Sequence, residues 1–332
     1  CSSRRRHTRS CLKSRGLGYV YKRQLLTILK ASGGLGLFLL GMVIMTEGLR
    51  SLAGDSLRHA LMNFTKSPYS GASTGALSTA LLQSSSATTV AAVGFVGAGL
   101  MTFSEALGII FGANIGTTIT GWMVALLGFK FKLGMVVLPL ILLGVILKLF
   151  FKGRTSSLGY TLAGFGLIFV GITYMQEGMS GFEGIITPDT LPSDSFTAIL
   201  KLVALGIIST IITQSSSAGV AATLTALYAN VINFEQAAAL VIGMDVGTTV
   251  TALIATIGGS VNVRRTGFSH MIYNLFTGVM AILLIAPYIY MWENIAAGAL
   301  MQNAEIALVA FHTLFNTLGV MIILPFTHQF AQ

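Results

Sequence analysis

One polar peptide occurs twice within apolar stretches of this chain. Gln83-Ser84-Ser85-Ser86-Ala87 returns in the second half of the sequence as Gln214-Ser215-Ser216-Ser217-Ala218. Side chains that need hydrogen bonds are costly at membrane depth unless they bind one another or a solute. The doubled peptide therefore indicates either serines that hold helices together or a binding site built from two equivalent halves.

The composition predicts a membrane protein. Hydrophobic residues make up 54% of the chain and charged residues only 9%, whereas soluble domains carry about 25% charged residues. The 38 glycines are expected where helices pack closely or break in lipid. We therefore expect an all-α polytopic protein of the cell (inner) membrane, surrounded by lipid.

The net charge of +9 comes almost entirely from residues 1–24, which hold eight basic groups and no acid. Both cysteines, Cys1 and Cys11, also lie in this basic tail. We interpret the tail as a non-native segment and leave it out of the fold prediction. A lipid-binding arm and a targeting segment are the alternatives.

Seven apolar stretches are long enough for spanning helices of about 20 residues. They are residues 25–48, 105–127, 133–151, 157–178, 235–257, 266–289 and 303–326. Residues 70–101 and 194–232 differ, because each carries the Gln-Ser-Ser-Ser peptide in its middle. The halves on either side are too short or too polar to span. We predict that each forms a re-entrant helical hairpin with its tip buried in protein.

The duplication extends beyond the hairpin tips. Gly36–Gly41 resembles Gly166–Gly171, and Gly112–Thr118 resembles Gly243–Thr249, in the same order. This order predicts repeat 1 at residues 25–154, repeat 2 at 155–289 and a C-terminal transmembrane helix in 290–332. Three spans in each repeat place the two repeats in opposite orientations, which is typical of alternating-access carriers.

The charges of the predicted loops give an orientation. Eight basic residues fall on one side of the predicted spans and two on the other. Because cytoplasmic loops are enriched in lysine and arginine, the C-terminus is predicted to be cytoplasmic.

The hairpin tips are suited to bind an anion. Their serines can cap the half-helices that begin near Ala87 and Ala218. Each helix N-terminus offers unpaired N–H groups and about half a positive charge. Two such ends facing each other would bind an anion without lysine or arginine.

The predicted helices with internal glycines carry hydroxyls and a carboxylate. We expect the backbone to unwind at Gly112–Thr118 and Gly243–Thr249, so that carbonyls and Thr117, Thr118, Thr248 and Thr249 offer oxygen ligands to Na⁺. The alternative is a kink, with each threonine bonded to its own preceding turn. Asp245 is the one acidic residue predicted deep in the membrane, where a cation or proton would be its partner unless its role is structural.

Two histidine–asparagine pairs share one spacing. His270 with Asn274 and His312 with Asn316 each lie four residues apart, on one helix face. A proton relay and a structural pair are both open for them. The sequence shows no nucleotide loop, metal-ligand cluster, nucleophile–base pair or nucleic-acid motif. We therefore expect no enzyme activity, cofactor or nucleic-acid partner.

Together these motifs resemble the type II sodium–phosphate cotransporter family, in its bacterial branch. The doubled Gln-Ser-Ser-Ser, the Gly-Ala-Asn-Ile-Gly-Thr-Thr segment and Ala310–Asn316 carry the resemblance, which covers about residues 25–328. It implies inorganic phosphate as substrate and Na⁺ as coupling ion. The implied phosphate site comprises Gln83, Ser84, Ser85, Ser86, Gln214, Ser215, Ser216 and Ser217. The implied sodium ligands are Gln83, Ser84, Asn114, Thr117, Thr118, Gln214, Ser215, Asp245, Thr248 and Thr249.

One residue departs from the resemblance, because the family usually has asparagine where this chain has Asp245. A carboxylate there would bind Na⁺ more strongly, admit competition by H⁺ or oppose phosphate, so the sodium stoichiometry and electrogenicity stay open. A passive anion pathway and a membrane regulator of phosphate homeostasis are the alternative functions. Transport direction, another tetrahedral oxyanion as substrate and a homodimeric assembly also stay open.

Overall fold

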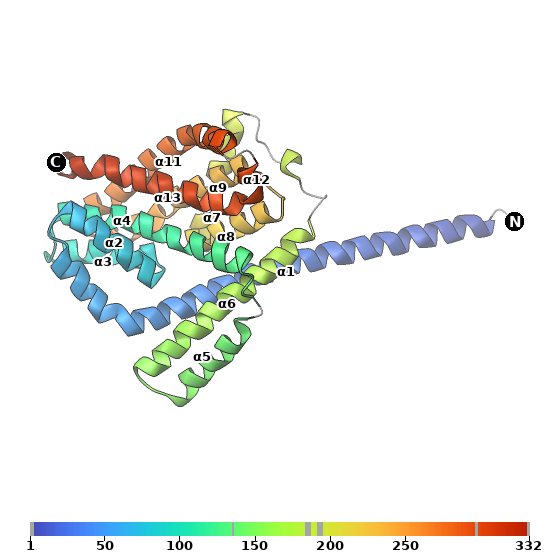
Figure 1. The fold of residues 1–332 in the computed structure, drawn as a ribbon, viewed down its shortest axis with the longest axis horizontal. Helices are drawn as coiled ribbons and strands as arrows, with labels where there is room; N and C mark the ends of the chain where they lie inside the picture. The colour runs from blue at the N-terminus through green and yellow to red at the C-terminus, as the bar shows by residue number, and fades with distance from the viewer. Residues whose placement is uncertain (1–2, 135, 183–186, 191–194, 296–297, 331–332) are drawn as a thin grey trace.

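The structure is a computed structural model that describes residues 3–134, 136–182, 187–190, 195–295 and 298–330. Within these ranges every regular element is helical, as predicted. In chain order the α-helices are α1 (Ser3–Phe64), α2 (Pro68–Leu82), α3 (Ser85–Gly97), α4 (Phe103–Trp122), α5 (Leu138–Phe150), α6 (Arg154–Ser180), α7 (Phe196–Thr213), α8 (Ser216–Tyr228), α9 (Phe234–Gly247), α10 (Thr249–Ala255), α11 (Val261–Ile295), α12 (Ala299–Gln302), α13 (Ala304–Ile323) and α14 (Thr327–Phe330). A π-helix (Met123–Lys130) continues α4, and two short 3₁₀ helices lie at Pro188–Thr190 and Leu324–Phe326. Figure 1 shows this arrangement.

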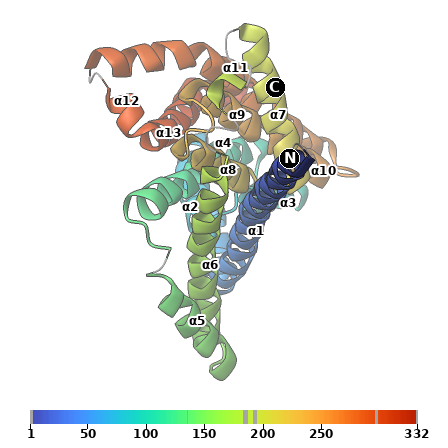
Figure 2. The same ribbon diagram turned by 90° about the vertical axis from the view of Figure 1, so that its right-hand side faces the viewer.

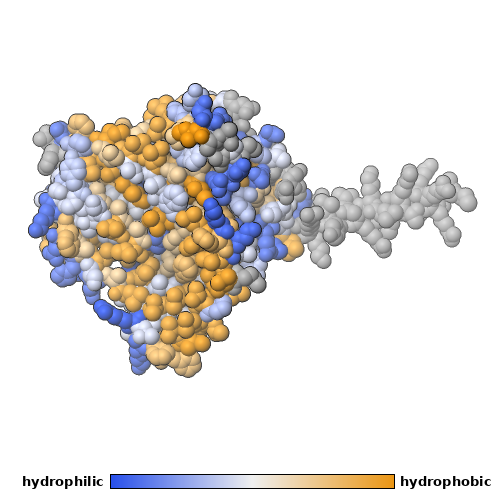
Figure 3. Space-filling model, in the orientation of Figure 1, coloured by the Kyte–Doolittle hydropathy of each residue, from blue (hydrophilic) through white to orange (hydrophobic). Residues whose placement is uncertain are grey.

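Seven helices of the described chain are long and apolar enough to cross a membrane. They are Gln24–Phe64, Phe103–Lys130, Arg154–Ser180, Phe196–Thr213, Phe234–Ala255, Val261–Ile295 and Ala304–Phe326. Apolar side chains also cover much of the visible face of the helical body in Figure 3. The chain is therefore a multi-pass membrane protein.

The predicted span at residues 133–151 is wrong. The helix there, α5, has 13 residues. At about 1.5 Å per residue it is about 20 Å long, shorter than the hydrocarbon core of about 30 Å. The apolar run starts at Leu133, but the helix begins only at Leu138. Conversely α7, predicted as half of a hairpin, has 18 residues and is long enough to span.

Helix α1 is longer than predicted, and α4 lacks the internal break that was predicted. The first span is predicted at residues 25–48, but α1 continues to Phe64 and begins within the basic tail. The break predicted in repeat 1 is also absent, because α4 is continuous through Gly112–Thr118. In repeat 2 α9 ends at Gly247 and α10 begins at Thr249, but Thr248 keeps helical backbone angles, so the helix is interrupted without the predicted unwinding.

The glycines of α4 serve close packing instead of unwinding. A Cβ at Gly112 would overlap the carbonyl oxygen of Ala72 on α2. The equivalent position in the second half, Gly243 on α9, is pressed in the same way against the carbonyl oxygen of Val203 on α7. The pairs α2–α4 and α7–α9 therefore meet backbone to backbone, and small residues are what allow this approach in lipid.

Helices α1 and α6 form the other close pair. They lie side by side in Figure 2, with α5 alongside α6. Gly34 and Gly171 face each other at this crossing, and so do Gly41 and Gly164. The glycines of α1 and those of α6 thus meet at a shared interface.

Both hairpins reverse at a glutamine. Gln83 follows α2 and Gln214 follows α7, each with φ of 53° in the left-handed region. Residues other than glycine rarely adopt this conformation. Glycine would adopt this backbone conformation with less strain, so the presence of glutamine indicates that its side-chain amide has a function at the tip.

Candidate functional site

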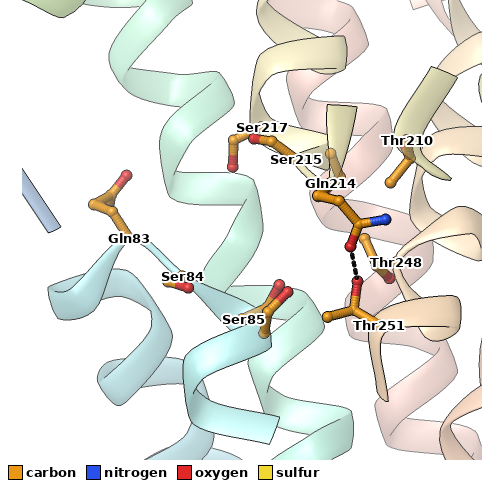
Figure 4. A pocket seen from close by; sticks show the side chains of 11 residues that line it. Gln83, Ser84, Ser85, Thr210, Gln214, Ser215, Ser217, Thr248 and Thr251 are labelled. Atoms are coloured by element: carbon orange, nitrogen blue, oxygen red, sulfur yellow. Dashed lines mark hydrogen bonds between the residues drawn. The ribbon is translucent and has the colours of Figure 1, made fainter. Parts of the chain in front are cut away.

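The two hairpin tips line one pocket. Its volume is about 60 Å³, which at about 10–15 Å³ per water-sized sphere is comparable to the four oxygens of one tetrahedral oxyanion. Figure 4 shows the tips facing each other across this pocket. The lining residues are Gln83, Ser84, Ser85, Ser86, Thr210, Gln214, Ser215, Ser216, Ser217, Thr248 and Thr251. All eight predicted phosphate-site residues are thus brought together.

The tip serines cap helices as predicted, with one cap in each tip. Ser84 Oγ accepts a hydrogen bond from the Ala87 N–H at 3.2 Å, and Ser215 Oγ accepts one from the Ala218 N–H at the same distance. The pocket therefore lies at the N-terminal ends of α3 and α8, where N–H groups and the positive ends of the helix dipoles gather. No charged side chain is among the described residues that line it.

Each glutamine amide is fixed by a threonine from the neighbouring helix. Thr120 donates to Gln83 Oε1 at 2.9 Å, and Thr251 donates to Gln214 Oε1 at 3.0 Å. The Nε2 groups of both glutamines donate to a carbonyl of the preceding helix at 2.6 Å. The sequence reasoning missed these two threonines, although each follows its glutamine at the same spacing and so belongs to the duplication.

The predicted sodium ligands are divided by the structure. Thr248 lines the pocket, together with two threonines that were not predicted, Thr210 and Thr251. The hydroxyls of all four predicted threonines bond to their own preceding turn, at Ala113, Ile115, Asp245 and Val246. Thr117, Thr118, Thr249 and Asn114 lie outside the pocket lining. The three threonines bond to their own preceding turn, as in the alternative interpretation, whereas Asn114 bonds to Asn274.

Asp245 lies behind the pocket in a buried polar cluster. Its side chain is buried, and Oδ1 lies 3.5 Å from Nε2 of His312 on α13. Asn274 on α11 donates from Nδ2 to the Asp245 carbonyl at 2.8 Å and to Thr248 Oγ1 at 3.3 Å, and Asn114 on α4 bonds to Asn274 in turn. Residues of α4, α11 and α13 thus form one cluster with Asp245 of α9, and Thr248 connects this cluster to the pocket.

The two histidine–asparagine pairs belong to this cluster in different ways. Asn316 Nδ2 donates to the His312 carbonyl at 3.2 Å, so the second pair is bonded through the backbone. His270 and Asn274 are both buried on α11, but both ring nitrogens of His270 have no hydrogen-bond partner among the described residues. The same is true of Asp245 Oδ2. A buried carboxylate oxygen without a donor is costly, so this place favours a cation or proton.

A second, larger space adjoins the pocket and is called the vestibule here. Its volume is about 380 Å³. Residues Leu39, Met42, Val43, Thr46, Glu47 and Arg50 of α1 line it, with Gln83, Ser84, Thr213, Gln214 and Ser215. Gln83, Ser84, Gln214 and Ser215 line both spaces, so the vestibule borders the pocket on the side of α1.

The chain is similar to several curated proteins. It is 27% identical over 303 residues to "Uncharacterized protein YqeW" of Bacillus subtilis, which covers 89% of this chain and 93% of that protein. It is also 27% identical over 312 residues to "Putative inorganic phosphate export protein YjbB" of Escherichia coli, where it spans 93% of this chain and 55% of the relative. A 77-residue stretch is 42% identical to "Sodium-dependent phosphate transport protein 2A" of Ovis aries, which is 23% of this chain and 12% of that protein.

No solved structure matches the chain. The sequence profile of the Na⁺/Pi-cotransporter family matches residues 37–177 and 193–323. These two segments contain both hairpins and both helices that fix the glutamines, α4 and α9–α10. The chain therefore belongs to the Na⁺/Pi-cotransporter family.

Proposed function

We propose that this protein is a secondary active transporter that couples Na⁺ to the movement of inorganic phosphate across the cell membrane by alternating access. One observation carries the proposal: two equivalent hairpin tips meet at a single uncharged pocket of oxyanion size. Helix N-termini and hydroxyls bind an anion through dipoles and hydrogen bonds. A site without a full positive charge also releases the anion more readily, which a carrier requires.

Sodium has two places near the phosphate in this proposal. Gln214, Ser215 and Thr248 offer oxygens at one side of the pocket. Asp245 is the other place, next to Thr248, whose hydroxyl donates to the Asp245 carbonyl at 2.6 Å. A cation at either place would reduce the repulsion between phosphate and Asp245, so that binding of each ion favours the other.

The family and the names of the relatives support phosphate as substrate. The C-terminus is proposed to be cytoplasmic from the loop charges. With that orientation the vestibule, which carries Arg50, opens toward the cytoplasm.

The first test is flux. Purified protein in proteoliposomes is expected to accumulate ³²P-phosphate when an inward Na⁺ gradient is imposed and to lose this accumulation in K⁺. A carrier of this kind reaches internal phosphate above the external concentration, whereas a passive pathway only equilibrates it. Phosphate uptake that does not depend on the Na⁺ gradient contradicts the coupling. The absence of phosphate flux in either direction favours the alternative function, a membrane regulator of phosphate homeostasis.

The second test addresses the tips. Ser85→Ala and Ser216→Ala are each expected to weaken phosphate binding by about threefold to tenfold, because each removes one hydrogen-bonding hydroxyl worth about 1 kcal/mol. Isothermal titration with phosphate measures this in detergent. Ser73→Ala is the matched control, since Ser73 is exposed on α2 and its hydroxyl donates to the Tyr69 carbonyl of the same helix. Wild-type affinity in both tip variants would place the anion elsewhere.

A further inference from the structure

A hydrogen-bonded chain joins the two halves of the protein at one side of the pocket. Ser217, in the second hairpin, donates to Thr120 Oγ1 on α4 at 3.3 Å. Thr120 donates in turn to the amide oxygen of Gln83 in the first hairpin at 2.9 Å. The tip of one hairpin is thereby bonded to the helix that fixes the tip of the other.

The duplication supplies a counterpart for every member of this chain. Ser86, Thr251 and Gln214 occupy the positions in the other repeat that are equivalent to Ser217, Thr120 and Gln83. Thr251 donates to Gln214 at 3.0 Å, as its counterpart does to Gln83. Within the described part of the protein, however, no hydrogen bond joins Ser86 to Thr251. Both residues line the pocket instead, so the pocket occupies the place of the missing bond.

Burial follows the same asymmetry. Gln83 is buried and Gln214 is exposed, although they are equivalent residues. The pocket is lined by Thr210, Thr248 and Thr251 and not by their counterparts Thr79, Thr117 and Thr120. Thr79 bonds to Thr88 at 3.0 Å. The second repeat has Gly219 at the position equivalent to Thr88, so the hydroxyl of Thr210 lacks this bond for a reason of sequence and has no partner in the described chain. The structure is thus closed on the first-repeat side and open on the second.

We propose that Thr120 and Thr251 are paired positioning residues that determine on which side the transport pocket opens. In the state seen here Ser217 is bonded to Thr120 and the pocket separates Ser86 from Thr251. In the opposite state Ser86 donates to Thr251, the Ser217–Thr120 bond is broken, and the pocket moves toward Thr79 and Thr117. Each threonine acts through the glutamine that it fixes. This inference rests on the proposed alternating access.

The size of the effect follows from the strength of one hydrogen bond. A net contribution of about 0.5–1.5 kcal/mol corresponds to about a 2- to 12-fold change in a two-state equilibrium. Removing the Thr120 hydroxyl breaks its bond to Gln83 in both states and also the bond to Ser217 in the state seen here, so it weakens that state more. Removing the Thr251 hydroxyl breaks its bond to Gln214 in both states and weakens the opposite state more, because only there does Ser86 bond to it. The two substitutions are therefore expected to shift the equilibrium in opposite directions.

The chain is well suited to a cysteine-accessibility experiment, because Cys1 and Cys11 are its only cysteines. Replacing both with serine gives a cysteine-free parent. Thr46→Cys places a reporter in the vestibule, which α1 lines. Gln176→Cys places the matched reporter at the equivalent position of α6, since both residues directly precede a Glu-Gly pair. Maleimide labelling rates are measured in proteoliposomes for both reporters.

We expect Thr120→Val to lower the labelling rate of the Thr46→Cys reporter and to raise that of the Gln176→Cys reporter by about 2- to 12-fold. Thr251→Val is expected to raise the labelling rate of the Thr46→Cys reporter and to lower that of the Gln176→Cys reporter. If the parent protein is already almost entirely in the state seen here, the Thr46→Cys rate is at its maximum and does not rise further. Thr120→Ser keeps the hydroxyl and should restore the parent rates. Ser217→Ala removes the same bond from its other end and should reproduce Thr120→Val if that variant fails to fold.

The same proteoliposomes separate the two ways in which the idea can fail. If the cysteine-free parent shows no Na⁺-driven ³²P-phosphate accumulation, the proposed function itself fails. If it does accumulate phosphate while Thr120→Val and Ser217→Ala leave both labelling rates unchanged, or change both in one direction, the positioning role is overturned.

Discussion

Gly112→Val is expected to abolish the folded protein, whereas Gly36→Ala should leave it intact. At Gly112 even a single methyl group would overlap the carbonyl oxygen of Ala72. Backbone cannot move aside as a side chain can, so α4 must separate from α2 along its length. Overpacking of a core typically costs about 1–3 kcal/mol, and the collision with backbone places this substitution at the upper end or beyond.

Fluorescence-detected size exclusion of tagged protein in detergent measures the result. We expect a loss of the monodisperse peak for Gly112→Val and, by the same argument, for Gly243→Val on α9. Gly36 is the control because nothing lies within 4 Å of the place where its Cβ would stand. In addition, alanine favours a helix over glycine by about 0.5–1 kcal/mol. A normal peak for both valine variants would show that the two helix pairs are not packed backbone to backbone.

This packing also explains what the sequence could not predict about α4. Glycine in a spanning helix either loosens the backbone or allows another helix to approach, and the pattern Gly-x-x-x-Gly is the same in both cases. At Gly112 and Gly116 the second use applies, and the predicted break is absent. At Gly247 the helix does end, but Thr248 keeps helical backbone angles of −61° and −25°. The interruption is thus a local tightening of the helix.

The pocket, by contrast, could be predicted almost completely at its tips. A polar peptide that recurs inside apolar sequence, in a matching context, has few structural explanations, and both copies line one space. The threonines that complete the site could not be found in this way. Threonine in apolar helices commonly bonds to its own preceding turn, so a hydroxyl there does not by itself indicate a site. Thr210 and Thr251 have counterparts in Thr79 and Thr120, but only the structure shows that they line the pocket.

The ends of the helices also could not be predicted well, because hydropathy does not report where a helix begins or ends. The apolar run that contains α5 starts at Leu133, several positions before the helix begins at Leu138. The polar residues after Glu47 do not end α1, which has favourable helix formers and continues to Phe64. Hydropathy reports where a segment can be buried, whereas the end of a helix is determined by its caps and by the packing of its last turn.

Asp245→Asn is expected to raise the Na⁺ concentration for half-maximal phosphate flux by at least about tenfold, with little change in the amount of folded protein. The carboxylate is buried and Oδ2 has no hydrogen-bond donor among the described residues. Its nearest partner, His312 Nε2, is 3.5 Å from Oδ1. Hydrogen bonds and contacts to a charged group contribute about 1.5–3 kcal/mol, which corresponds to about 10- to 150-fold in affinity.

Stability gives the discriminating readout for this acid. Asparagine has nearly the same shape and removes a buried charge that is costly to desolvate, so the thermal midpoint without Na⁺ should stay equal or rise. Na⁺ that binds the folded state raises the midpoint in the wild type, because ligand binding stabilises the state that binds it. This Na⁺-dependent rise should shrink in Asp245→Asn and persist in the control Glu293→Gln, which removes an exposed carboxylate from α11. A variant that folds poorly but keeps the wild-type response to Na⁺ would instead show that Asp245 has a structural role, with the coupling ion bound among the threonines of the pocket.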